Sequence, residues 1–100
     1  MGFFSDLMSR KAIGAQGKEL ARQFGKRLTK ERVNDAKRVA AEFDIMVGHA
    51  LGYERKTGLG VYGKSQLVNA FQWTLVDEGF AEEFAREIGN ELAIKLASSG

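Results

Sequence analysis

The chain has 100 residues, of which 44% are apolar and 28% are charged, and its formal net charge is +2. This length allows one hydrophobic core, and the composition is that of a folded domain rather than a disordered chain. Cysteine is absent, which excludes disulfides, zinc fingers and thiol chemistry. No apolar run approaches the about 20 residues of a membrane-spanning helix, and the chain does not start like a signal peptide. We therefore expect a single cytoplasmic domain over residues 1–100.

Helix-forming residues dominate the composition, because proline is absent and Ala, Leu, Glu, Lys and Arg are frequent. Apolar residues recur at helical spacing, and no alternating stretch is long enough to predict a strand. The predicted fold class is therefore all-α, a small bundle of about four helices. The helices are expected over residues 3–24, 29–52, 65–77 and 80–97, with one long Gly-rich loop over residues 52–63.

The second expected helix begins at Thr29 as its N-cap and stops near Gly52. Its apolar residues recur at intervals of three and four, which predicts one side facing the core. That predicted core stripe consists of Val33, Ala36, Ala40, Phe43, Val47 and Ala50.

Small residues recur at every fourth position on the first and on the last expected helix. A ridge without side-chain bulk lets two helix backbones approach each other closely. We therefore expect these two helices to touch, within one chain or between two copies. Such a contact would also pair a basic helix with an acidic one. The two ridges are Gly17, Ala21 and Gly25 on the first helix, and Ala81, Ala85, Gly89 and Ala93 on the last.

Residues 58–65 match the phosphate-binding pattern G-x-x-x-x-G-K-[S/T], which ends here in Lys64 and Ser65. In a nucleotide-binding protein this loop follows a buried strand, whereas a polar stretch over residues 52–57 precedes it here. A chain of this length also cannot hold the parallel sheet on which the motif depends. We predict no cofactor, and nucleotide binding at this segment stays a third hypothesis.

Catalytic and metal-binding patterns are not evident in the sequence. His49 is the single histidine, so it cannot form a His-based metal site, and we interpret it as a solvated surface residue. The carboxylate pairs at residues 77–78 and 82–83 lie in an acidic helical region and are typical of solvated faces. We therefore predict no catalytic residue, no metal site and no enzymatic activity.

Positive charge is concentrated in the first part of the chain. Residues 1–40 hold ten Lys/Arg and four Asp/Glu, a net of +6, whereas residues 41–100 hold five and nine, a net of −4. A basic helix could follow a phosphate backbone, so a small nucleic-acid-binding protein is the alternative functional hypothesis. The same asymmetry would arise if the two parts pack against each other. The basic stripe on the first helix consists of Lys11, Lys18, Arg22 and Lys26.

Apolar side chains outside the expected core favour an interaction surface. Trp73 points away from the apolar face of the third helix, so it belongs either to a contact surface or to core beneath the Gly-rich loop. The apolar start of the chain could also meet a membrane surface. The leading hypothesis is a self-associating helical protein–protein interaction module that binds a protein partner, such as an acidic one. Its predicted partner-binding residues are Phe4, Met8, Lys18, Arg22, Lys26 and Trp73.

Overall fold

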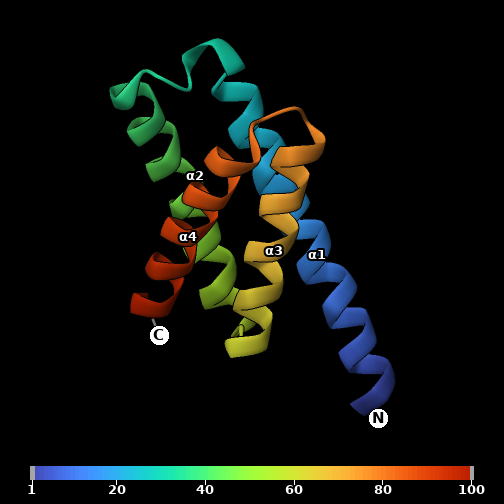
Figure 1. Cartoon of the computed structure of the whole chain (residues 1–100). Helices are drawn as coiled ribbons and strands as arrows, with labels where there is room; N and C mark the ends of the chain where they lie inside the picture. Colours follow the sequence, from blue (N-terminus) through green and yellow to red (C-terminus); the bar gives the residue numbers. More distant parts are fainter. Residues whose placement is uncertain (1, 100) are drawn as a thin grey trace.

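The computed structural model describes the backbone of residues 2–99 and the side chains of residues 10–98. Within this part of the chain the protein is all-α, as predicted, and contains no strand (Figure 1). A short 3-10 turn, η1 (Lys30–Arg32), joins the first two helices. The four helices are α1 (Gly2–Arg27), α2 (Ala36–Thr57), α3 (Val61–Asp77) and α4 (Glu82–Ser99).

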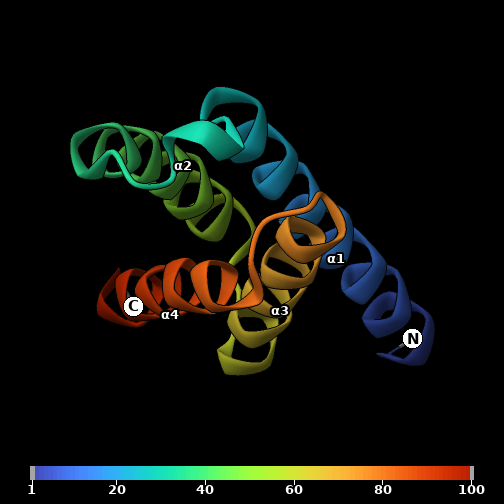
Figure 2. The same ribbon diagram turned by 45° about the horizontal axis from the view of Figure 1, so that its top comes forward.

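The four helices form a ring in which each packs on two neighbours. α1 packs on α2 and α3, and α4 packs on the same two helices, so α1 and α4 lie diagonally across the bundle. α1 and α3 run in the same direction and α2 and α4 run in the opposite one (Figure 1). Figure 2 shows α1 and α3 side by side, with α2 and α4 diverging on the other side of the bundle.

Aromatic rings at the centre of the core join α1 both to its neighbour α3 and to the diagonal helix α4. The ring of Phe24 on α1 lies 5.9 Å from that of Phe71 on α3 and 6.4 Å from that of Phe84 on α4. Fully burying each such side chain, or a leucine, contributes about 1.5–3 kcal/mol. The largest fully buried side chains are Phe24, Phe71, Leu20, Leu28, Leu67, Leu75, Leu92 and Leu96.

The two ridges of small residues both face α3. A Cβ added to Gly17 would lie 2.6 Å from the carbonyl oxygen of Leu67 and 2.8 Å from the Cβ of Ala70. A Cβ added to Gly89 on α4 would lie 2.9 Å from the side-chain oxygen of Gln72. The first and last helices touch within the chain, as predicted, but they do so through the stacked rings of Phe24 and Phe84 and not through the two ridges, because the ridges pack on α3.

The long Gly-rich loop predicted over residues 52–63 is also wrong. α2 continues through Gly52 to Thr57, because Leu51 and Tyr53 on either side of this glycine pack partly against the core. The helix ends at Gly58, whose positive φ of 66° is the left-handed conformation that glycine adopts without steric cost. The connection to α3 is therefore short.

The start of α2 and half of its predicted core stripe differ from expectation as well. Thr29 precedes η1 and forms no side-chain cap, whereas the Asp35 carboxylate accepts a hydrogen bond from the Arg38 N–H at 3.2 Å and caps α2. Val47 and Ala50 are buried, but Ala36 and Ala40 are exposed. The amino-terminal half of α2 leaves its apolar side only partly covered, because α4 diverges from it there (Figure 2).

We predict opposite effects for the same substitution at two glycines of α1. Gly17→Ala should lower the free energy of unfolding by about 1–3 kcal/mol, because its methyl group would clash with the α3 backbone. Gly14→Ala should raise it by up to about 1 kcal/mol, because nothing lies within 4 Å of the added Cβ and alanine favours the helix. Chemical denaturation followed by circular dichroism measures both. Equal stabilities of the two variants would contradict the close α1–α3 contact.

Candidate interaction surface

The basic stripe of α1 faces solvent. Lys18, Arg22 and Lys26 follow one another at intervals of four residues, and all three are exposed. Lys11 extends the stripe toward the amino terminus and is also exposed. The spacing keeps these side chains on one side of the helix, so their positive charges reinforce each other.

Trp73 is partly exposed on α3. Its relative solvent exposure is 52%, which excludes a place in the core beneath a loop. Tyr62 stands on the same flank of α3, eleven residues or about three turns earlier, and is 91% exposed. Both aromatic residues therefore present large side chains to solvent.

The parallel arrangement of α1 and α3 sets which of their residues stand at the same level. Gly17 lies against Leu67 and Ala70, and eight residues further along, Gly25 lies beside Glu78 and Phe80. The offset between the two helices is thus nearly constant along their contact. Trp73, three residues beyond Ala70, consequently stands at the level of the α1 segment that begins just after Gly17.

Helical geometry places the basic stripe and Trp73 on the same side of this helix pair. Gly17 and Ala70 mark the line along which α1 and α3 touch. Measured around each helix axis from that line, Lys18 and Arg22 are rotated by about 100–140° on α1, and Trp73 is rotated by about 60° on α3. Both rotations lead away from the core that α2 and α4 cover. We define the Trp73 face as the surface formed by Lys18, Arg22, Lys26 and Trp73.

Two predicted contact residues are not part of this placement. Phe4 and Met8 belong to the amino-terminal end of α1, but their side chains lie outside the described residues 10–98. Their contribution to an interface stays a prediction.

Glu19 and Asp77 are exposed on the same two helices, so the surroundings of the Trp73 face are not purely basic.

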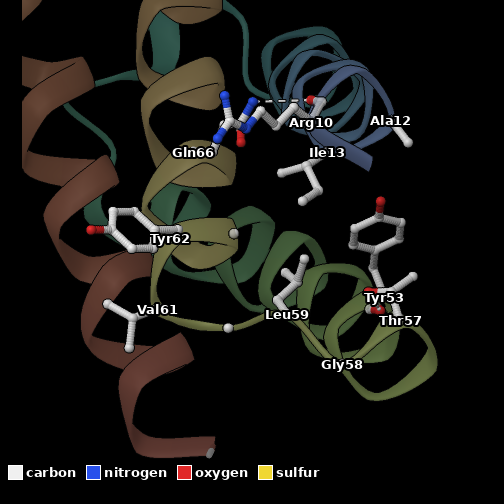
Figure 3. Close-up of a pocket in the computed structure, with 12 residues that line it drawn as sticks. Arg10, Ala12, Ile13, Tyr53, Thr57, Gly58, Leu59, Val61, Tyr62 and Gln66 are labelled. Atoms are coloured by element: carbon white, nitrogen blue, oxygen red, sulfur yellow. Dashed lines mark hydrogen bonds between the residues drawn. The ribbon is translucent and has the colours of Figure 1, made fainter. Parts of the chain in front are cut away.

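The P-loop-like segment does not form a phosphate-binding loop. α3 begins at Val61, so Gly63, Lys64 and Ser65 are helical, and the Lys64 N–H donates to the Gly60 carbonyl at 2.9 Å. An open cavity of about 520 Å³ lies over this turn, between the start of α3 and α1 (Figure 3). Tyr53 and Ile13 line it, and Gln66 donates a hydrogen bond to the Arg10 carbonyl at 3.0 Å across its edge.

A buried carboxylate that the sequence analysis missed lies between α1 and α2. Glu42 is only 8% exposed, and its Oε2 lies 3.6 Å from the Nε of Arg38. Among the described residues its Oε1 has no hydrogen-bond partner. His49 is exposed and shares with Glu42 a void of about 10 Å³, which is too small for a substrate. The position of Glu42, four residues before the buried Met46, was the signal in the sequence that this carboxylate faces α1.

No group of three His, Asp or Glu side chains in the described part of the chain could hold a metal ion. None of the helices within residues 2–99 has both the length and the apolar character required to cross a membrane.

Neither protein-family models, nor curated proteins, nor solved structures match the chain.

Replacing Glu42 by a side chain of similar size should stabilise the fold. Glu42→Met removes a buried carboxylate oxygen that lacks a partner, and we expect the free energy of unfolding to rise by about 1 kcal/mol. Glu82→Met is the matched control, because Glu82 also faces an arginine one turn away but is exposed. The control should change stability by less than about 0.5 kcal/mol. A clear loss of stability in Glu42→Met, measured by thermal denaturation, would show that the carboxylate is needed.

Proposed function

We propose that the chain is a non-enzymatic helical protein–protein interaction module that binds through the Trp73 face and self-associates. The observation that supports this proposal is the 52% exposure of Trp73 at the level of two exposed cations, Lys18 and Arg22. Tryptophan and arginine are enriched among the residues that dominate binding energy at interfaces. An exposed tryptophan among cations therefore favours a contact surface over a solvated helix face.

The Trp73 face combines two contributions to binding. Burial of the indole supplies affinity, because an aromatic side chain can remove about 150–250 Å² from water. Lys18, Arg22 and Lys26 attract an acidic surface, which raises the association rate and fixes the orientation of the partner. We propose an acidic protein surface as the partner, met in the cytoplasm. A second copy of the chain qualifies, because residues 41–100 carry a net charge of −4.

Removing the indole should abolish self-association. We expect Trp73→Ala to weaken it at least about tenfold in sedimentation equilibrium, because the apolar anchor is lost. Val61→Ala is the matched control on the same helix, since Val61 is 82% exposed and lies outside the Trp73 face. Phe4→Ala tests the predicted second anchor. If Trp73→Ala and Phe4→Ala both leave self-association and every isolated complex unchanged, the proposal is refuted.

The alternative function is nucleic-acid binding by the same side of α1. The exposed aromatic residues Tyr62 and Trp73 beside a basic stripe favour it, because bases stack on such rings while cations contact phosphates. Four cations form the stripe, so binding would be weak, independent of sequence and sensitive to salt.

Fluorescence anisotropy of a labelled DNA single strand and of a labelled DNA duplex tests this alternative. If the protein binds nucleic acid, its affinity for the DNA should fall about 100-fold between about 50 and 200 mM salt, because about four counterions are released on binding. Lys18→Glu together with Arg22→Glu should remove the binding. Anisotropy that stays flat at both salt concentrations would exclude the alternative and leave a protein partner for the Trp73 face.

A further inference from the structure

A groove lies between α2 and α4. These two helices are on the other side of the bundle from the α1–α3 pair that carries the Trp73 face (Figure 2). Its volume is about 520 Å³, and its apolar lining includes Phe43 from α2 and Phe84 from α4, both partly buried. Two exposed carboxylates of α4, Glu87 and Glu91, stand one helical turn apart and are the charged residues of its lining. The groove is therefore apolar at its base and acidic along one edge.

The groove arises from an apolar stripe that the bundle leaves uncovered. Residues at helical spacing along α2 predict burial, yet Ala36 and Ala40 are exposed and Val39 and Phe43 are only partly buried. The same stripe becomes fully buried further along, at Ala50. Uncovered apolar surface beside charged groups is characteristic of a binding site.

We propose that this groove receives the Trp73 face of a second copy of the chain. The proposal rests on the proposed function, because it names the acceptor surface for that face. Charge complementarity supports the choice of occupant: Lys18 and Arg22 flank the indole, and Glu87 and Glu91 flank the groove. The aromatic base of the groove matches the indole, since aromatic side chains pack favourably on one another.

Opposite placement of the two surfaces determines the form of the assembly. A copy that offers its Trp73 face to one neighbour still has a free groove for the next. Such a contact is heterologous and forms a ring or an open chain rather than a two-fold symmetric dimer. Assemblies should therefore grow with concentration, and they should shrink with added salt, because the ion pairs at the edge of the groove are screened.

Two variants that each block one surface test the proposal directly. Trp73→Ser removes the inserted side chain, and Ala40→Arg places a bulky cation in the groove at an exposed helix position that tolerates it. Each variant alone should be monomeric in sedimentation velocity from about 5 to 500 μM. An equimolar mixture should form a 1:1 heterodimer and nothing larger, because one intact face remains to meet one intact groove.

Charge reversal in the groove provides the second measurement. Glu87→Lys with Glu91→Lys should weaken self-association at least about tenfold. The matched control is Glu31→Lys with Glu82→Lys, which changes the net charge equally at exposed residues outside the groove and should leave self-association within about twofold of the wild type.

The outcomes separate this proposal from the proposed function. If Ala40→Arg and the groove charge reversal both assemble like the wild type while Trp73→Ser is monomeric, the groove is not the acceptor and the interaction module stands. If Trp73→Ser also assembles normally, or if the wild type stays monomeric throughout, the groove proposal and self-association through Trp73 both fail. A mixture of the two blocked variants that shows only monomers likewise overturns the groove proposal.

Discussion

The close contact between α1 and α3 at Gly17 determines how the rest of the bundle is arranged. A Cβ at this position would lie within 3 Å of the α3 backbone and of Ala70, so only glycine permits the approach. Glycine inside a helix costs about 1 kcal/mol relative to alanine, and burial of Phe24 and Phe71 beside the contact offsets that cost. The approach also brings the basic stripe of α1 to the flank of α3 that carries Trp73.

A consequence of this tight pair is the looser packing of the other two helices. α1 and α3 share the most extensive contact in the bundle, whereas α2 meets its neighbours over less surface. The first half of α2 therefore keeps a partly uncovered apolar side, and the groove with Glu87 and Glu91 forms there. A basic aromatic face and an acidic apolar groove thus lie on opposite sides of the bundle, and these are the two surfaces that we propose to meet in head-to-tail assembly.

Sequence periodicity predicted the buried side of a helix best where that helix packs mainly on one neighbour. On α4, the apolar residues at helical spacing Ala85, Ile88, Leu92 and Leu96 are buried, whereas Phe84 is half-buried and Ala81 is exposed. α3 ends before Gly79, whose φ is 100°. Periodicity did not predict that Glu42 is buried or that Ala36 and Ala40 are exposed. A periodic pattern shows which side of a helix is apolar, but it does not show whether another helix covers that side. Gly52 was misread as a stop, since the packing of Leu51 and Tyr53 outweighs the intrinsic preference of one glycine.

The candidate site was predictable only in part for the same reason. The common side of the cations followed from their spacing within α1, whereas the sequence left Trp73 either in a contact surface or in core beneath a loop. Their position on one side of the molecule required the parallel α1–α3 register, which no local pattern encodes. The P-loop-like match shows that a local pattern can also occur without the structure that it usually marks, because residues 58–65 form the start of a helix and not a phosphate-binding loop.

Amide chemical shifts recorded over a dilution series test most directly whether the Trp73 face mediates contact between copies. We expect rising concentration to shift or broaden the signals of the Trp73 indole N–H and of the amides of Lys18, Arg22 and Lys26. Amides near Glu87 and Ala40 should respond in parallel, because the opposing surface binds at the same time. Changes confined to other surfaces, or spectra that do not change with concentration, would contradict self-association through the Trp73 face.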